Sequence, residues 1–174
     1  MIDFHVLNSS HEELEDFSLP FAKLLYEAVQ SGASMGYLLE TPLSELEAFW
    51  SSILSDVSHG NAKIVYAQEE RVPIGVVVLA FEKNPNAKHR AEVAKLIVAR
   101  EKQGLGVGKK LLSLLEMEAR MSEKSLLILD TETDSVADSL YQSLQWTRLG
   151  EMPSHSASPN GELRPTTFYF KELF

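Results

Sequence analysis

The stretch KLIVAREKQGLGVGKKLLSLL, residues 95–115, decides the fold, because it joins two elements through a turn rich in glycine. Residues 91–98 form an apolar run of strand length that ends just before this turn. Behind the turn, apolar residues recur with the i, i+4, i+7, i+8 spacing of an amphipathic helix, at Val107, Leu111, Leu114 and Leu115. The sequence therefore predicts a strand, a glycine-rich turn over 103–108 and a helix, in that order.

Such a turn is suited to bind an anion. Glycine lets the backbone approach a ligand closely, and the first turn of a helix leaves N–H groups unpaired at the positive end of the helix dipole. Two familiar phosphate-binding patterns nevertheless do not fit. The dinucleotide fingerprint GxGxxG would require glycine where Lys109 stands, and a P-loop would require glycine where Gln103 stands.

The rest of the chain divides into further strand and helix patterns. Apolar periodicity predicts helices from Leu19-Pro20 to Gly32, from an N-cap at Thr41 with Pro42 at N1 to Gly60, and over Val136, Leu140 and Leu144. Apolar runs predict strands at 2–7, 62–67, 74–81 and 125–131, and two more strands within 146–172 around a loop at 153–161. We find no repeat or linker, so we expect one α/β (α+β) domain over 1–174 with the order β-α-α-β-β-β-α-β-α-β-β.

Composition and charge exclude several classes of protein. Cysteine is absent, which excludes disulfides, thiolate metal sites and a cysteine nucleophile. The N-terminus lacks the pattern of a signal peptide, and no apolar run is long enough to span a membrane, so we expect a cytoplasmic protein. The formal net charge of −9 argues against nucleic acid as a partner. Residues 88–110 nevertheless carry a local net charge of +5, which suits either a phosphate-bearing ligand or a solvated surface.

The pattern that does fit the turn is R/Q-x-x-G-x-G/A, as Gln103, Gly106 and Gly108. Here the sequence resembles the GCN5-related N-acetyltransferase (GNAT) family, and its closest form is the tabtoxin resistance protein branch. The segments that look like this branch are GASMGY (32–37), HRAEVAKLIV (89–98), LLILDTETDSVADSLY (126–141) and PTTFYFK (165–171). The resemblance implies a mixed, mostly antiparallel sheet with splayed central strands, flanked by helices.

The resemblance also implies acetyl-CoA as co-substrate and no metal. The backbone of Leu96, Ile97 and Val98 would then pair with the pantetheine arm. The backbone N–H groups of the turn would hold the pyrophosphate, at Gln103, Gly104, Leu105, Gly106, Val107, Gly108 and Lys109. Lys102, Lys109 and Lys110 are candidates for the outer phosphates, although each is equally readable as an ordinary surface lysine.

Acetyl transfer to an amine needs a base for the acceptor and a proton donor for the leaving thiolate. The family commonly carries a tyrosine at the position of Tyr141, which is therefore the candidate acid, its alternative being a core aromatic. Two carboxylates are candidates for the base. Asp130 ends an otherwise apolar strand, where it serves either catalysis or the cap of the next helix. Glu92 precedes the turn, and its alternative is an ion pair with Arg90 or Lys88.

Other motifs are weaker. Gly32 to Gly36 spells G-x-S-x-G, and Ser34, Asp130 and His155 follow in the chain order of α/β-hydrolases, but the segment lacks the strand–turn–helix context of a nucleophile elbow. In related acetyltransferases this segment lies near the acceptor entrance, which makes Ser34 and Tyr37 candidate substrate contacts, and Arg90 is a third. The histidines show no metal-binding spacing.

We therefore expect an acetyl-CoA-dependent acetyltransferase that acts by direct transfer on the amine or hydroxyl of a small molecule, such as a β-lactam or amino-acid-like toxin. We expect no nucleic-acid or membrane partner, and a monomer or homodimer. The alternatives are a non-catalytic acyl-CoA-binding module and, more remotely, a serine hydrolase that uses the GASMG segment.

Overall fold

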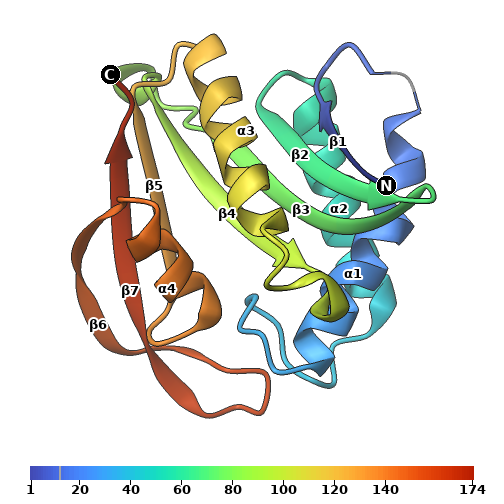
Figure 1. Cartoon of the computed structure of the whole chain (residues 1–174), viewed down its shortest axis with the longest axis vertical. Coiled ribbons are helices and arrows are strands. Elements are labelled where there is room, and N and C mark those ends of the chain that lie inside the picture. The colour runs from blue at the N-terminus through green and yellow to red at the C-terminus, as the bar shows by residue number, and fades with distance from the viewer. Residues whose placement is uncertain (12) are drawn as a thin grey trace.

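A computed structural model describes residues 1–11 and 13–174 of the chain (Figure 1). The strands are β1 (Ile2–Leu7), β2 (Ala62–Glu69), β3 (Val72–Phe81), β4 (Arg90–Val98), β5 (Leu126–Glu132), β6 (Thr147–Ala157) and β7 (Leu163–Glu172). The helices are α1 (Ser18–Gln30), α2 (Leu43–Ser58), α3 (Val107–Met121) and α4 (Val136–Ser143). Short 3₁₀ turns lie at η1 (Leu14–Phe17), η2 (Pro85–Ala87) and η3 (Arg100–Lys102). The order of strands and α-helices is the one predicted.

The seven strands form one sheet with the order β1-β2-β3-β4-β5-β7-β6. Neighbouring strands are antiparallel except β4 and β5, which run parallel. A parallel pair needs a crossover connection, and α3 supplies it between these two strands. The predicted mixed, mostly antiparallel α/β (α+β) sheet is confirmed.

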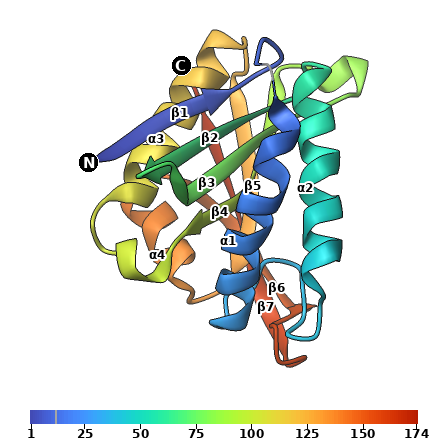
Figure 2. The same ribbon diagram turned by 90° about the vertical axis from the view of Figure 1, so that its right-hand side faces the viewer.

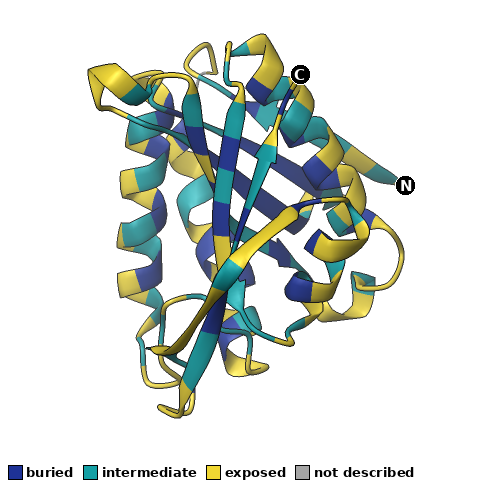
Figure 3. Ribbon diagram, turned by 90° about the vertical axis from the view of Figure 1, so that its left-hand side faces the viewer, coloured by how far each residue is buried: buried dark blue, intermediate teal, exposed yellow. Residues whose placement is uncertain are grey.

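Helices cover both faces of the β2–β4 part of the sheet. Figure 2 shows α1 and α2 on one face and α3 on the other. Each helix buries the apolar stripe that its periodicity predicts, through Phe21 and Leu25 on α1, Trp50 on α2, and Leu111 and Leu115 on α3, all with no exposed surface. β2 and β3 lie between these helices and are apolar on both faces, whereas the edge strand β6 is largely exposed (Figure 3).

The two central strands separate after a short paired region. β4 pairs with β5 only at Arg90, Ala91 and Glu92, and their last partners are Glu92 and Ile128. Beyond this point β4 carries a bulge opposite β3, where the register shifts between Val76 and Val78 and Lys95 takes a φ of 53°. A bulge bends a strand and increases its twist. The edge of β4 that faces β5 is therefore left without a strand partner from residue 93 onward, and the gap widens toward α4 (Figure 1).

Three local predictions are wrong. Pro42 is the N-cap of α2, with ψ at 149°, and Thr41 accepts a hydrogen bond from the Leu38 N–H instead of capping the helix. Val136 opens α4 with 77% of its surface exposed, because this short helix buries the face of Asp138 and Tyr141. β6 continues to Ala157 and so includes the first half of the expected loop at 153–161. The turn-forming residues there lie in a bulge of the strand, where Ser154 has a φ of 52°.

Candidate active site

The glycine turn presents a row of free backbone donors. Gln103 N–H binds the Arg100 carbonyl and Lys110 N–H binds the Gly106 carbonyl, but within the described residues the amides of 104–109 have no backbone acceptor. Gly104 and Gly106 have φ angles of 75° and 82°, in the left-handed region that favours glycine, and Gly106 is the N-cap of α3. Leu105 is exposed, whereas Val107 is buried and anchors the helix start in the core. The turn therefore has the geometry of an anion cradle, with free amides at the N-terminus of a long helix.

The lysines around this cradle differ in their exposure and in whether they form an ion pair. Lys102 forms an ion pair with Glu69 on β2, which raises the pKa of the lysine and already engages its ammonium with a carboxylate. Lys109 and Lys110 are exposed on the first turn of α3. Lys109 and Lys110 are thus better candidates than Lys102 for binding an anion at the cradle.

The splayed edge of β4 connects this cradle to a pocket. Ile97 and Val98 pair with Val76 and Gly75 of β3, and the opposite edge of this segment lies beyond the last contact with β5. Gln103 donates from Nε2 to the Val98 carbonyl at 3.1 Å, which closes the turn onto the strand end. An extended ligand can therefore run along β4 from the turn toward Leu96.

At the far end of this edge lies a pocket of about 220 Å³ between the diverging strands. It is lined from β4 and β5, from α4, from the segment that joins α1 to α2, and from β6 and β7. The lining residues are Ser34, Met35, Gly36, Glu92, Val93, Ala94, Lys95, Leu96, Asp130, Thr131, Glu132, Ala137, Tyr141, His155, Ser156 and Thr166. Glu92, Asp130, Tyr141 and Ser34, four of the residues singled out in the sequence, therefore share one pocket.

Glu92 and Asp130 bring two carboxylates together where the strands part. Glu92 pairs with Ile128 in the last parallel contact, and Asp130 stands two residues further along β5, on the same face as Ile128. Both residues are exposed, but partial desolvation at the pocket raises the pKa of the Glu92 carboxyl, and the nearby Asp130 raises it further, while Lys95 opposes the shift. Among the described residues neither carboxylate has an ion-pair partner within 4.0 Å. Glu92 thus has the environment of a general base.

Tyr141 lies on the opposite wall and is only 4% exposed. Burial raises the pKa of its hydroxyl, and the charge of Asp130 adds to this effect, so the phenol keeps its proton throughout the neutral range. No side chain or carbonyl in the described part of the chain accepts a hydrogen bond from this hydroxyl. A buried phenol without a protein acceptor at a pocket wall is available as a donor to a ligand.

The ring of Tyr141 is held by α4 and β7. It packs edge-on against Trp146 at 5.7 Å between ring centroids, and it meets the ring of Tyr169 at a tilt with 6.0 Å between centroids. The cap of α4 is Ser135, whose Oγ accepts from Asp138 N–H at 3.1 Å, so Asp130 is not the cap residue. The buried Asp138 carboxylate accepts hydrogen bonds from the Tyr169 hydroxyl and from Asp134 N–H. These bonds fix the start of the helix that carries Tyr141.

Of the three candidate substrate contacts, one lines the pocket and two do not. Ser34 lines the pocket, and Tyr37 lies behind it, beside Lys95 and Phe49. Arg90 is not a lining residue, because it pairs with Glu82 at 2.5 Å and not with Glu92. Hydrogen bonds from the backbone of Asn84 and from Arg90 lower the pKa of Glu82 to about 2. The alternative of an ion pair between Glu92 and Arg90 is therefore wrong.

The hydrolase alternative fails on geometry. Ser34, Asp130 and His155 do line the same pocket, but His155 Nδ1 binds the Thr166 hydroxyl at 3.1 Å, and no hydrogen bond joins these three residues among those described. Ser34 follows the end of α1 and is not on a strand-to-helix turn. Within residues 1–11 and 13–174, no three His, Asp or Glu side chains gather as a metal would require. None of the helices described there has the length and apolar character that crossing a bilayer demands.

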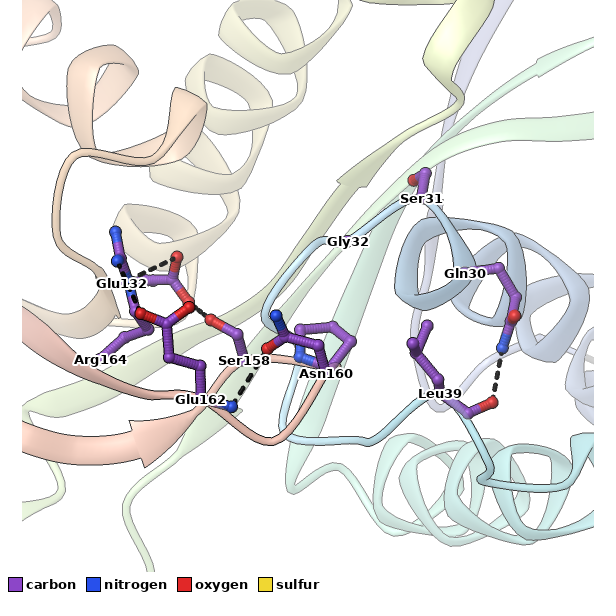
Figure 4. A pocket seen from close by; sticks show the side chains of 10 residues that line it. Gln30, Ser31, Gly32, Leu39, Glu132, Ser158, Asn160, Glu162 and Arg164 are labelled. Atoms are coloured by element: carbon purple, nitrogen blue, oxygen red, sulfur yellow. Dashed lines mark hydrogen bonds and ion pairs between the residues drawn. The ribbon is translucent and has the colours of Figure 1, made fainter.

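Sequence reasoning missed several lining residues, above all Lys95, Glu132 and Thr166. Glu132 also lines a second pocket of about 350 Å³, between the end of α1 and the turn that joins β6 to β7 (Figure 4). There Glu132 accepts a hydrogen bond from Ser158 at 2.6 Å and lies 3.9 Å from Arg164. The polar Glu132 and Thr166 at strand positions were the available signal, but only the strand pairing shows that they face this gap.

Comparison with known proteins agrees with this arrangement. A sequence model of the family described as "Acetyltransferase (GNAT) family" matches residues 23–145, which include the glycine turn, both carboxylates and Tyr141. The fold is similar to several solved acetyltransferase structures, all at low sequence identity.

Three of these structures illustrate the likeness. The protein yncA from Salmonella typhimurium, described as an acetyltransferase and solved with its cofactor acetyl-CoA, has a TM-score of 0.79 and 19% identity over 100% of this chain and 95% of that one. An N-acetyltransferase from Staphylococcus aureus Mu50 has a TM-score of 0.78 and 15% identity over 99% of both chains. Ribosomal-protein-alanine N-acetyltransferase from Brucella melitensis has a TM-score of 0.75 and 21% identity over 99% of both. At such identities the likeness is one of fold, and the match over residues 23–145 shows that the chain belongs to the acetyltransferase (GNAT) family.

Proposed function

We propose that the protein is an acetyl-CoA-dependent N-acetyltransferase that transfers the acetyl group directly to a small amine. The observation that carries this proposal is the continuity of one strand. β4 begins beside the carboxylates of the pocket and ends at the free amides of the turn at 104–109. A thioester bound along this strand would have its diphosphate at the helix N-terminus and its acetyl group near Tyr141.

The residues of the site fit acetyl-CoA. The free amides at 104–109 and the α3 dipole suit a diphosphate, and Lys109 and Lys110 add positive charge. The unpartnered edge of β4 at Leu96, Ile97 and Val98 suits an extended amide-bearing arm. When bound, acetyl-CoA supplies the acetyl group as an activated thioester.

Glu92 is the proposed general base. An acceptor ammonium with an ordinary pKa near 10.4 must lose its proton, which costs about 4–5 kcal/mol at pH 7. A carboxyl whose pKa is raised accepts a proton more readily than an ordinary one. Asp130, beside it, raises the pKa of Glu92 and adds negative charge that attracts a cationic acceptor. Asp130 remains the alternative base, since it lines the same pocket.

Tyr141 is the proposed donor to the leaving sulfur. A thiol has an ordinary pKa of about 8.5. A neutral donor that faces the sulfur stabilises the departing thiolate as the carbon–sulfur bond breaks. The Tyr141 hydroxyl has no acceptor among the described residues and keeps its proton at neutral pH because of its burial. Tyr141 would thus donate a proton to the leaving sulfur, and Glu92 would accept one from the acceptor amine, within the same pocket.

The acceptor is small. The pocket of about 220 Å³ suits a small amine, and its carboxylates favour a positively charged one. The resemblance of residues 89–98 and 126–141 to the tabtoxin resistance protein branch supports a β-lactam or amino-acid-like toxin as the acceptor. A hydroxyl acceptor would depend on the base even more strongly.

The proposal is tested first by thermal unfolding with saturating acetyl-CoA, with NADH and ATP as controls. A ligand at 100 times its dissociation constant adds about 2.7 kcal/mol of stability, which for this chain length raises the midpoint by about 5–11 °C. We expect this rise with acetyl-CoA alone. The second step measures CoA release with a panel of small amines, amino acids and β-lactams. Binding without CoA release from any of them would favour the non-catalytic acyl-CoA-binding module, and no rise would overturn the proposal.

A further inference from the structure

Lys95 has an unusual place in the strand that carries the candidate base. It stands at the β4 bulge with a φ of 53°, in the left-handed region that a lysine rarely adopts. The register with β3 passes from Val78–Ala94 to Val76–Ile97 at this point. Bulges near active sites re-aim a side chain. At this bulge the strained backbone of Lys95 therefore directs its side chain to the pocket, which Lys95 lines.

The ammonium of Lys95 is fastened to the segment that joins α1 to α2. Its Nζ donates to the Met35 carbonyl at 2.7 Å and lies 5.5 Å from the ring centroid of Tyr37 and 5.2 Å from that of Phe49. Gly36 lies directly beside it, since a Cβ at Gly36 would be 3.6 Å from Nζ. One cation thus makes a hydrogen bond and a cation–π contact with this segment, and a second cation–π contact with Phe49 of α2.

Among the described residues this segment makes few other hydrogen bonds to the body of the fold, although Met35 and Tyr37 also pack against the hydrophobic core. Further along the same segment, Leu39 N–H binds the Pro159 carbonyl at 2.9 Å, and Gln30 donates to the Leu39 carbonyl at 2.8 Å (Figure 4). These bonds hold the segment at the second pocket. At the pocket between the diverging strands, in the structure that is described, the hydrogen bond that joins residues 34–36 to the sheet comes from the Lys95 ammonium.

Lys95 does not serve as the ion-pair partner of the carboxylates. No carboxylate of the described residues lies within 4.0 Å of its Nζ, although the charges of Asp130 and Glu92 act on it. Burial lowers the pKa of this ammonium, and the two carboxylates oppose that shift. A half-buried cation that binds a loop carbonyl instead of a nearby carboxylate costs desolvation without gaining an ion pair. Its contacts point to a role in holding the loop.

We propose that Lys95 is a positioning residue that holds the segment 34–37 over the acceptor pocket and thereby determines acceptor binding. This inference rests on the proposed acetyltransferase function for its kinetic part only. The attachment of the segment itself is a property of the free protein. The charge of Lys95 has a second consequence, because it lowers the pKa of Glu92 and so favours the ionised base. The titratable groups around it are Glu92 on β4, Asp130 and Glu132 on β5, Tyr141 on α4, His155 on β6 and Tyr37 on the segment itself.

The attachment is tested by hydrogen–deuterium exchange in the absence of any acceptor. In Lys95→Met we expect the amides of 33–38 to exchange about tenfold faster than in the wild type, with little change elsewhere, because one hydrogen bond and two cation–π contacts are lost. Lys95→Arg keeps the cation and restores slow exchange. The matched control is Lys83→Met, which removes an exposed ion pair with Asp56 and leaves the segment unchanged. Unchanged exchange in Lys95→Met would overturn the proposal.

The kinetic test uses the amine with the highest kcat/KM in the acceptor panel. In Lys95→Met we expect its KM to rise about tenfold or more, while the thermal shift with acetyl-CoA stays that of the wild type. The acidic limb of kcat/KM should move to higher pH, because the pKa of Glu92 rises when the lysine charge is lost. Lys95→Arg should keep the KM for the amine and the position of the acidic limb at wild-type values. An unchanged KM and pH profile would overturn the role in acceptor binding. If the wild type acetylates no amine, the proposed acetyltransferase function is wrong. The exchange experiment still decides whether Lys95 holds the segment.

Discussion

Gly108 on α3 lies directly against Leu140 on α4: a Cβ at Gly108 would be 3.2 Å from Leu140 Cδ2 and 3.6 Å from Val98 Cγ2. The start of the helix behind the anion cradle thus touches the helix that carries Tyr141. The glycine of the motif serves helix packing as well as the turn. A side chain larger than alanine at this position would push the start of α3 away from α4.

The size of the residue at position 108 should therefore affect stability stepwise. We expect Gly108→Ala to stay within about 1 kcal/mol of the wild type, because the gain in helix propensity offsets a small shift of the flexible Leu140. Gly108→Val should cost about 1–3 kcal/mol through overpacking. Urea denaturation measures both. Gly150→Val is the control, since a Cβ there meets nothing within 4 Å. Equal stability of Gly108→Val and the wild type would contradict the close packing.

Gly106 should matter for a different reason, its φ of 82°. A Cβ there meets no atom within 4 Å, so Gly106→Ala introduces backbone strain alone, about 1 kcal/mol or more. Relief of this strain would turn the cradle amides, so we expect weaker acetyl-CoA binding by calorimetry. Gly60→Ala is matched, because Gly60 has a φ of 73° and equally open surroundings. It should lose similar stability but keep its affinity. Equal affinities of the two variants would argue against the cradle.

Tyr141→Phe separates activity from stability. The hydroxyl has no acceptor among the described residues, so its loss should change the free energy of unfolding by about 0.5 kcal/mol or less. A donor to the leaving group contributes about 10²–10⁴ to the rate, and we expect kcat to fall by that factor. Tyr26→Phe, at an exposed position of α1, is the control and should be fully active. A loss of less than about threefold in Tyr141→Phe would remove the donor role.

The pH dependence of kcat/KM should identify the base. With Glu92 as base, the rate rises as its carboxyl loses a proton, at a pH above that of an ordinary glutamate because its pKa is raised. Asp130→Asn removes a charge that raises the pKa of Glu92, so the acidic limb should move to lower pH while activity remains. Glu92→Gln should abolish the limb and most of the rate. If Asp130→Asn abolishes activity and Glu92→Gln does not, Asp130 is the base.

The hydrogen bond between Tyr169 and Asp138 should stabilise the site. Tyr169→Phe leaves the buried Asp138 carboxylate, 3% exposed, with the Asp134 amide as its one donor among the described residues. We expect a loss of about 1.5–3 kcal/mol, the range for hydrogen bonds to charged groups. Chemical denaturation measures it, and Tyr26→Phe again provides the control. A loss below about 0.5 kcal/mol would mean that water replaces the hydroxyl.

Local chemistry determined much of this protein from the sequence alone. Apolar periodicity is a property of neighbouring residues, so it predicted the order of the elements and the helix that begins at Val107. The glycines of the turn were likewise informative, because a φ of 75° or 82° is a local requirement. The glycine turn before α3 could be predicted for this reason before any strand was paired, while its binding of an anion stays a prediction.

Only the tertiary structure decided which side chains meet in the pocket, because strand register and bulges depend on partners distant in the chain. Glu92 and Asp130 come together because the parallel contact of β4 with β5 ends at Ile128. Arg90 pairs with Glu82 because β3 and β4 are adjacent, and local order did not distinguish this partner from Glu92. Lys95 looked like one polar residue in an apolar run. The bulge against β3 turned it toward Met35, which is 60 residues away in the chain.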